Sequence, residues 1–328
     1  MYTEPHGGAT FFAGLTKSRR YSPASPSASS SLSDQAGDLR RLVEAQRRGV
    51  RQHRGNGPRT IAVLSGKGDV GKSNLALALT CALADGGNRV VLLDADLGMA
   101  NIDLLCGISS RFNLSHVVEG SRCLDEVVVP LEENVEILPG GSGLKDLADL
   151  DDTELTGVID SLELLEDRAD IVVLDTGAGI HKGVLAFALA ADTTILVTTP
   201  EPTSVRDAYG VLKSLEGASP EGKEFLLVVN MANSDGEARE VAGRILTASH
   251  QFLGRSPIYL GHVLRDDSVG RAVRLGRTFY RLFPAAPAGL CVRRLAEELL
   301  ARWGDRGGLS YPPRGWKAFF LRLSRGFL

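Results

Sequence analysis

Short apolar runs rich in β-branched residues recur along the middle of the chain and alternate with longer segments of helical periodicity. Runs of roughly four to eight such residues are typical of strands buried on both faces of a parallel sheet. The intervening segments repeat apolar residues every three to four positions, as a helix packed on a sheet requires. The pattern predicts strands at Thr60–Ser65, Arg89–Asp94, Asn134–Leu138, Asp170–Asp175, Thr193–Thr199, Glu224–Asn230 and near Ile258–Leu260, and helices at Lys72–Asp85 and at about 153–166, 181–190, 203–216, 235–253, 267–275 and 287–302.

This alternation predicts an α/β fold for residues 59–303, with a single doubly wound, mostly parallel sheet covered by helices on both faces. No apolar run reaches the roughly 18 residues of a membrane-spanning helix, and the N-terminus lacks the apolar core of a secretory signal. We therefore expect a cytoplasmic protein.

The N-terminal segments depart from this pattern. Residues 1–33 are rich in Ser, Pro, Gly and Ala, so they bury too little apolar surface to fold, and we expect them to be disordered. Residues 34–48 space their apolar side chains as a helix does, which predicts a short amphipathic helix. Residues 49–58 then form a linker before the first strand.

The C-terminal segment, 316–328, follows a Gly/Pro-rich linker at 304–315 and is strongly amphipathic. On a helical wheel five large apolar residues fall within one arc of about 100°, and cations flank it. This arrangement is typical of a helix that lies in an anionic membrane surface. The alternative is that the same stripe packs on the protein's own core. The predicted membrane-binding residues are Trp316, Phe319, Phe320, Leu323 and Phe327.

The net charge of −3 conceals a segregation of charge along the chain. Residues 1–59 sum to +6, residues 60–264 to −17 and residues 265–328 to +8. Basic ends on an acidic body suggest contact with an anionic partner, the alternative being that they only maintain solubility. The four cysteines are isolated, without a C-x-x-C pair, which argues against structural zinc, an iron–sulfur cluster or a disulfide framework.

Residues 66–73 (GKGDVGKS) match the phosphate-loop pattern G-x-x-x-x-G-K-[ST]. They follow a predicted strand and open a predicted helix, which is the context that this motif needs. Glycines let successive backbone N–H groups face one anion, and the helix N-terminus adds a favourable dipole. Lys72 is expected to reach the β- and γ-phosphates and Ser73 to bind Mg²⁺. The predicted nucleotide-binding residues of this loop are Gly66, Lys67, Gly68, Asp69, Val70, Gly71, Lys72, Ser73 and Asn74.

Acidic residues follow two of the predicted strands. Asp94 and Asp96 end the strand at Arg89–Asp94, and Asp175 ends the strand at Asp170–Asp175. Parallel sheets bind ligands at the carboxyl ends of their strands. Asp175 is therefore expected to hold a Mg²⁺-bound water, as the second acidic strand of a phosphate-loop ATPase does. Capping of the following helix is the alternative role for such a residue.

The second lysine of the loop, Lys67, makes the motif resemble the deviant phosphate loop of the MinD/ParA family of ATPases. The resemblance implies ATP and Mg²⁺ as cofactors, slow hydrolysis, and a homodimer in which Lys67 reaches the nucleotide of the opposite subunit. It further implies that Asp96 activates the attacking water and that Asn230 reads adenine. Asp69 stands where the family usually has Gly, and its carboxylate would repel the phosphates.

Four further segments resemble the FlhG/FleN branch, which controls flagellar number and placement: 93–103 (LDADLGMANID), 138–143 (LPGGSG), 175–180 (DTGAGI) and 198–209 (TTPEPTSVRDAY). The resemblance implies peripheral attachment to the inner face of the cytoplasmic membrane in the ATP state, through the terminal helix. It also implies that the N-terminal helix contacts the flagellar GTPase FlhF, with flagellar basal-body or regulatory proteins as further partners. The matching positions of that helix are Asp34, Gln35, Ala36, Leu39 and Arg40.

The leading hypothesis is thus an ATP-dependent dimerising switch at the membrane that regulates flagella. Two alternatives stay open. One is a non-hydrolysing nucleotide-binding adaptor, disabled by Asp69. The other is a ParA-like partitioning ATPase that binds DNA through basic residues near the C-terminus. These are Arg265, Arg271, Arg274, Arg277 and Arg281.

Overall fold

The computed structural model describes residues 57–96, 101–141, 166, 168–218, 223–304 and 315–327. All of them belong to one compact unit, Gly55–Leu328. The predicted disordered segment 1–33, the predicted partner-binding helix at 34–48 and nearly all of the predicted helix at 153–166 lie outside the described residues.

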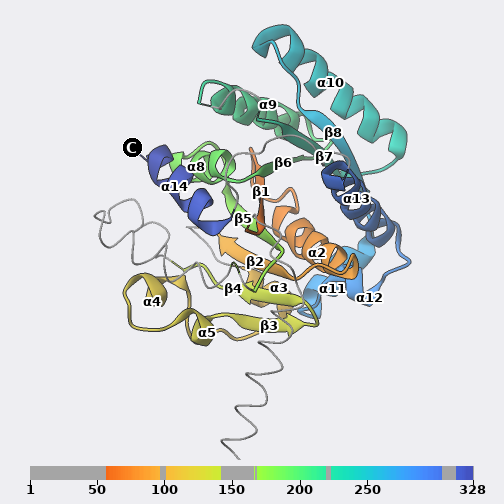
Figure 1. The fold of residues 1–328 in the computed structure, drawn as a ribbon. Coiled ribbons are helices and arrows are strands. Elements are labelled where there is room, and N and C mark those ends of the chain that lie inside the picture. Colours follow the sequence, from red (N-terminus) through yellow and green to blue (C-terminus); the bar gives the residue numbers. More distant parts are fainter. Residues whose placement is uncertain are drawn as a thin grey trace, which may run out of the picture. The chain divides into compact units, whose positions relative to one another are not determined.

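Eight strands form one sheet in the order β3-β4-β2-β5-β1-β6-β7-β8 (Figure 1). Every neighbouring pair is parallel except β3 and β4, which are antiparallel at one edge. The prediction of a single, mostly parallel sheet is confirmed. The strands are β1 (Arg59–Ser65), β2 (Val90–Ala95), β3 (Val129–Glu132), β4 (Val135–Leu138), β5 (Ile171–Ala178), β6 (Thr193–Thr198), β7 (Phe225–Ala232) and β8 (Ile258–Leu264).

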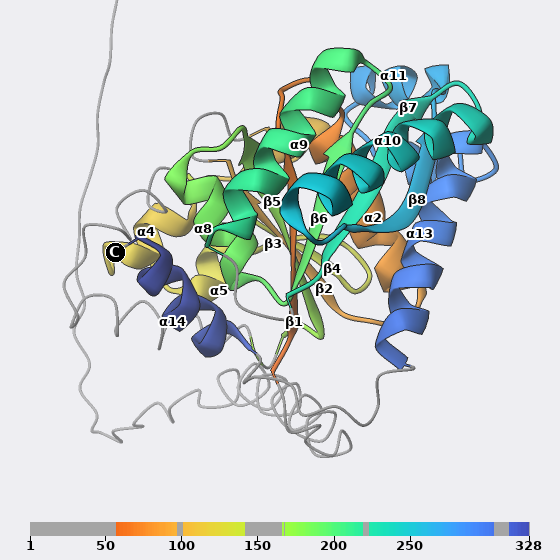
Figure 2. The same cartoon turned by 90° about the horizontal axis from the view of Figure 1, so that it is seen from above.

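Helices cover both faces of this sheet (Figure 2). Ile61 and Val63 of β1 point into a core shared with α2 and α13, whereas Ala62 and Leu64 point into cores on the opposite face, under α8, α9, α10 and α14. The long helices are α2 (Lys72–Asp85), α8 (Lys182–Ala190), α9 (Pro202–Glu216), α10 (Asp235–Leu253), α11 (Asp267–Arg274), α13 (Pro287–Gly304) and α14 (Trp316–Phe327). The short ones are α3 (Ile102–Cys106), α4 (Leu114–Val118), α5 (Leu124–Val127) and α12 (Phe279–Leu282).

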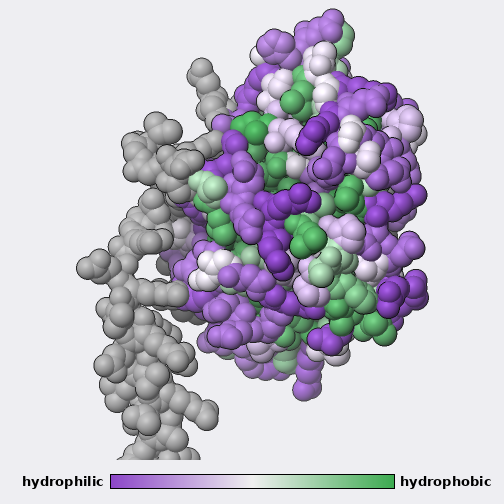
Figure 3. All heavy atoms as spheres, turned by 90° about the vertical axis from the view of Figure 1, so that its right-hand side faces the viewer, coloured by the Kyte–Doolittle hydropathy of each residue, from purple (hydrophilic) through white to green (hydrophobic). Residues whose placement is uncertain are grey.

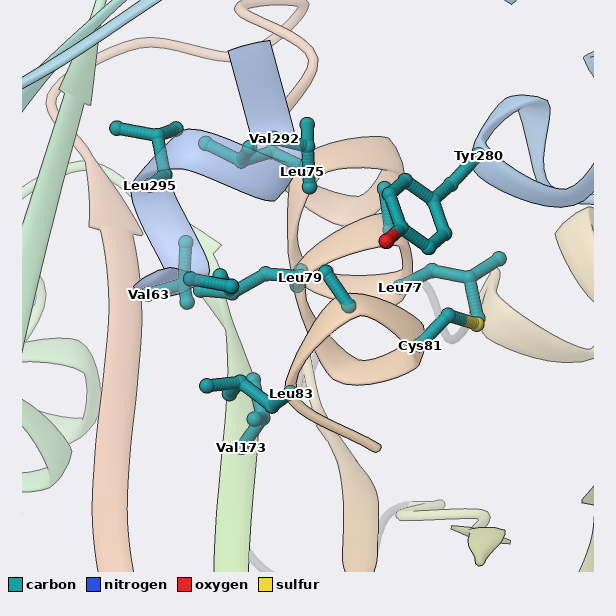
Figure 4. Close-up of a cluster of buried hydrophobic side chains, with 14 of the residues drawn as sticks. Val63, Leu75, Leu77, Leu79, Cys81, Leu83, Val173, Tyr280, Val292 and Leu295 are labelled. Carbon is teal, nitrogen blue, oxygen red and sulfur yellow. The ribbon is translucent and has the colours of Figure 1, made fainter. Parts of the chain in front are cut away.

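Helix α2, which follows the phosphate loop, is buried on almost every side: 11 of its 14 residues are buried. Its leucines pack between the sheet, through Val63 and Val173, and the side chains of α13 (Figure 4). At its far end the Tyr280 hydroxyl donates to Asp85 at 2.8 Å. The loop at the start of α2 is therefore held by a helix that cannot shift without repacking the core.

Helix α14 forms where the sequence predicts it, but its aromatic face is not exposed. Phe319, Phe320 and Leu323 are 0, 1 and 2% exposed and belong to the core under α8. The rings of Phe319 and Phe187 stack with their centroids 6.2 Å apart. These three residues therefore do not form a free surface in this structure but pack on the protein's own core, the alternative that the sequence left open. Their binding to lipid stays a prediction. The side chains of the other two residues, Trp316 and Phe327, lie outside the described set.

Polar contacts fix α14 in this place as well. Arg322 Nε donates to the carbonyl of Ala190 at 2.6 Å, and the Arg322 guanidinium lies 3.0 Å from the carboxylate of Asp192. Cations near a helix C-terminus are favourable because unpaired carbonyls gather there. The sequence pattern alone does not distinguish packing of α14 on the core from binding of α14 to a membrane. Both bury one apolar stripe of the helix and leave cations at its flank.

Within the part of the chain that the structure describes, no helix is both long and apolar enough to cross a bilayer.

Candidate functional site

The phosphate loop lies between β1 and α2, at the carboxyl edge of the sheet. Gly71 adopts a left-handed backbone with φ 77° immediately before α2. A Cβ atom at Gly66 would come within 2.4 Å of the Asp207 backbone on α9, so this position requires glycine. The loop is thereby wedged between α2 and α9, which presents its backbone as a preformed cradle for an anion.

Asp69 occupies the exposed tip of this loop with φ 61°. This left-handed conformation suits glycine, and aspartate is one of the few other residues that tolerate it. The turn therefore forms with aspartate at a position where the MinD/ParA family, which the loop resembles, usually has glycine. The cost is local strain together with a carboxylate near the position of the phosphates.

Lys72 and Asp175 form a buried ion pair at the base of the loop. Lys72 Nζ lies 2.6 Å from Asp175 Oδ1, and both residues are buried. Burial raises the pKa of the Asp175 carboxyl, while Lys72 and a hydrogen bond from Ser73 oppose that rise. The lysine thus neutralises a carboxylate that would otherwise be costly to bury.

The same residues fit the Mg²⁺ that the sequence predicts. Ser73 offers a hydroxyl and Asp175 a carboxylate, which are the oxygen ligands that Mg²⁺ prefers. Among the described residues, no group of three or more His, Cys, Asp and Glu side chains is arranged to hold a metal ion. The predicted metal contacts are therefore these two residues beside the phosphate cradle.

Asp94 and Asp175 are register partners on the neighbouring strands β2 and β5. Burial raises the pKa of Asp94 to about 6; the hydrogen bond from Ile102 opposes this rise, and the charge of Asp175 adds to it. Its carboxylate accepts the backbone N–H groups of Asp96 at 3.2 Å, Asn101 at 3.0 Å and Ile102 at 3.2 Å. Asp94 therefore links Asp96 to Asn101 and Ile102, the residues on either side of segment 97–100.

Asp96 follows β2 and faces Gly177, which follows Asp175 by two residues on β5. A Cβ atom at Gly177 would lie 3.5 Å from Asp96 Oδ1. The charge of Asp96 also raises the pKa of Asp175, so the two carboxylates share one electrostatic environment. The structure thus brings the predicted water-activating residue next to the predicted metal-binding residue.

Lys67 is held by its own chain. Its ammonium lies 2.7 Å from Glu201 Oε2 and 3.3 Å from the Thr203 hydroxyl, at the start of α9. The pair with Glu201 raises the pKa of Lys67 and lowers that of Glu201. The sequence did not predict a role for Glu201, although Glu201 lies in segment 198–209, which resembles the FlhG/FleN branch. No pattern in that segment indicated a contact with Lys67.

Asn230 is the sixth residue of β7 and is buried. Its Nδ2 donates to the Val70 carbonyl at 2.7 Å, so it pins the phosphate loop to β7. It also lies against Gly71, where an added Cβ would come within 2.6 Å of Nδ2. Recognition of adenine by Asn230 stays a prediction, and loop positioning is a role that the sequence did not indicate.

Of the five arginines of the DNA-binding alternative, Arg281 is held inside the fold. Arg281 is bound to Asp85 at 2.8 Å and to Glu132 at 2.6 Å, joining α12 to α2 and β3. Its inclusion among DNA-binding residues is therefore wrong for this structure. Arg265, Arg271, Arg274 and Arg277 are exposed, and Arg271 lies over the ring of Phe283.

The surface on the right-hand side of the molecule in Figure 1 is mostly hydrophilic, with small separate hydrophobic patches (Figure 3).

A family model described as "CobQ/CobB/MinD/ParA nucleotide binding domain" matches residues 61–279. Antiactivator FleN of Pseudomonas aeruginosa is 37% identical over 80% of this chain and 91% of its own length. The flagellum site-determining protein YlxH of Helicobacter pylori is 31% identical over 80% of this chain and 88% of its own.

Solved structures of similar fold include the cell division ATPase MinD of Pyrococcus furiosus, with 27% identity and a TM-score of 0.59 over 74% of this chain and 99% of that one. The septum site-determining protein MinD of Pyrococcus horikoshii, complexed with Mg-ADP, has 26% identity and a TM-score of 0.60 over 77% of this chain and 100% of that one.

Proposed function

The chain belongs to the CobQ/CobB/MinD/ParA family of nucleotide-binding proteins, in the branch of FleN and YlxH, and from this premise we propose that it is an ATP-dependent switch that regulates flagellar number or placement. In this proposal ATP binding closes a homodimer, and hydrolysis opens it. The supporting observation is that Lys67 and Lys72 of the phosphate loop, Asp96 after β2 and Asp175 of β5, from three places in the sequence, lie along one edge of the sheet.

Each of these side chains has a distinct part in the proposed reaction. Lys72 leaves Asp175 for the β- and γ-phosphates, so charge compensation passes from a carboxylate to the nucleotide. Ser73 and, through a water, Asp175 would hold Mg²⁺, which supplies positive charge beside the phosphates. Asp96 accepts a proton from the attacking water, and Asp94 holds the segment that carries Asp96.

Dimerisation in this proposal requires Lys67 to exchange Glu201 for a phosphate of the opposite subunit. The Lys67 and Glu201 side chains are 39% and 63% exposed. Exposed ion pairs of this kind contribute little to stability, because water screens the two charges and both side chains lose freedom. The contact therefore holds the lysine in place without opposing its transfer strongly.

Contact with FlhF and with the membrane completes the proposal. The helix at 34–48 that resembles an FlhF-binding element lies outside the described residues. Lipid binding through the aromatic face of α14 requires this helix to leave α8, because Phe319 and Phe320 are buried. We propose peripheral, ATP-dependent attachment on that condition.

Replacing Asp69 with glycine is expected to raise ATP turnover several-fold, because glycine removes both the left-handed strain and the carboxylate near the phosphates. Phosphate release is measured for the natural protein, Asp69→Gly and Asp69→Asn. Asparagine tolerates the same backbone without the charge, so it separates the two causes. Activity confined to the Gly variant would favour the adaptor alternative, whereas comparable turnover in the natural protein would refute that alternative.

The flagellar role is tested by deleting the gene and counting flagella by electron microscopy. The deletion strain is complemented with the natural gene or with Lys72→Met. We expect altered flagellar number or placement in the deletion strain, restoration by the natural gene and no restoration by the variant. An unchanged pattern after deletion would refute the flagellar role and leave the ATPase proposal standing.

A further inference from the structure

Two exposed leucines lie on neighbouring surface segments, α3 and the C-terminal end of α11. Leu104 of α3 is 71% exposed, and Leu275, the residue that caps α11, is 65% exposed. The two segments touch through their backbones. A Cβ atom at Gly107 would lie 2.8 Å from the Gly276 carbonyl oxygen, and one at Gly276 would lie 3.6 Å from the carbonyl oxygen of Leu104. Single exposed leucines are ordinary, whereas two on touching segments form an apolar patch.

Three arginines flank Leu275 in the sequence. Arg271 and Arg274 lie on α11, Arg277 follows it, and all three are exposed. Residues 271–277 (RAVRLGR) contain no acidic residue, and none of the three arginines pairs with a carboxylate among the described residues. The helix dipole favours cations in the last turn of α11. The dipole does not account for an exposed leucine among them.

The first of these arginines is ordered by its neighbours. The Arg271 guanidinium lies 4.7 Å from the centroid of the Phe283 ring, which follows α12. An arginine that stacks on a ring keeps its N–H groups available for a carboxylate. Because its position is already restricted, Arg271 loses less conformational entropy when a partner binds. The surface therefore combines exposed apolar side chains with a preordered cation.

We propose that this surface, made of Leu104, Leu275, Arg271, Arg274 and Arg277, binds an acidic amphipathic helix of a partner protein. Apolar residues three or four positions apart on that helix would cover the two leucines. Its glutamates or aspartates would meet the arginines. Burial of apolar surface supplies affinity, and the charge pairs set the orientation of the helix and its association rate. The inference goes beyond the proposed switch, because none of these five residues has a part in the nucleotide site.

Three other occupants fit this surface less well. A nucleic acid would use the arginines through its phosphates but would leave the two leucines uncovered. A bilayer surface is usually bound through exposed aromatic side chains, but Phe283 lies beneath Arg271 and is only partly exposed. The N-terminal part of the chain does not complement the arginines, because residues 1–59 themselves sum to +6.

The test places the photo-crosslinking residue p-benzoylphenylalanine at Leu275 of the full chain, produced in the native cell after deletion of its own gene. Tandem mass spectrometry then identifies the segment that is cross-linked. We expect a segment of another protein with net negative charge and apolar residues three or four positions apart. The same replacement at Leu321, which is 46% exposed on α14, should not give this product, because α14 lies on the other side of the molecule (Figures 1 and 2).

A synthetic peptide of the captured segment then measures the affinity by fluorescence anisotropy with the purified full chain. Arg274→Glu and Arg277→Glu should each weaken binding at least about tenfold, and the loss should shrink at high salt. Arg122→Glu, whose side chain is 42% exposed before α5, should leave the affinity unchanged. Circular-dichroism melting curves show that each variant is folded.

Several results would overturn the proposal. One is the absence of any cross-linked protein at Leu275. Another is a cross-link confined to lipid, nucleic acid, this chain itself, or a neutral or basic segment. Equal peptide affinity in the natural protein and in both folded arginine variants would overturn it as well.

Discussion

Replacing Phe319 with alanine is expected to lower the free energy of unfolding by about 3–5 kcal/mol. The Phe319 ring is fully buried, stacks on Phe187 and meets Phe320 edge to face at 5.2 Å. Truncation removes this apolar surface and leaves a cavity that the packed helices α8 and α14 cannot fill by local adjustment. Chemical denaturation monitored by circular dichroism measures the change.

Leu321→Ala is the matched control, because Leu321 lies on the same helix and is 46% exposed. Its effect is expected to stay within about 1 kcal/mol, since little apolar surface is lost. Equal effects of the two substitutions would contradict the seat of α14 on α8. They would instead favour the free amphipathic helix that the sequence predicts.

Replacing Lys72 with methionine is expected to reduce ATP turnover at least about a hundredfold, because the loop loses the cation that meets the phosphates. It also leaves the buried carboxylate of Asp175 without its partner. Removal of one member of a buried ion pair typically costs about 3–5 kcal/mol. Phosphate release and denaturation together measure both losses.

Lys72→Met/Asp175→Asn separates the two effects. The double variant removes the unpaired charge, so it should recover stability while remaining inactive. Lys182→Met, an exposed lysine at the start of α8, serves as the control and should retain both properties. Recovery of turnover in the double variant would contradict the role of Lys72 at the phosphates.

The central sheet and the phosphate loop could be predicted from sequence because their signals are local. β-branched runs bounded by turns identify strands such as β6, and helices α2 and α10 have the bounds that the pattern predicts. The edge strand β3 was missed, since its sequence VPLE contains proline and is not apolar throughout. The short helices α3, α4, α5 and α12 span too few residues to show a helical period.

The remaining differences concern contacts between distant parts of the chain. Glu201 lies 134 residues from Lys67 in the sequence, and no pattern in either segment predicts their ion pair. The seat of α14 depends on an apolar surface of α8 that only the assembled fold presents. Arg281 likewise belongs to a cluster with Asp85 and Glu132, although its sequence context suggested a free cation. Tertiary geometry, rather than residue type, decided each case.

The central claim is that ATP closes a dimer through Lys67 and that ATP hydrolysis, which depends on Asp96, reopens the dimer. Sedimentation velocity of Asp96→Asn with ATP and Mg²⁺ tests it most directly, since the variant binds ATP without consuming it. The account predicts a dimer with ATP, a monomer with ADP, and a monomer in both states after Lys67→Ala is added. A monomer with ATP, or an undiminished dimer in Asp96→Asn/Lys67→Ala, would contradict it.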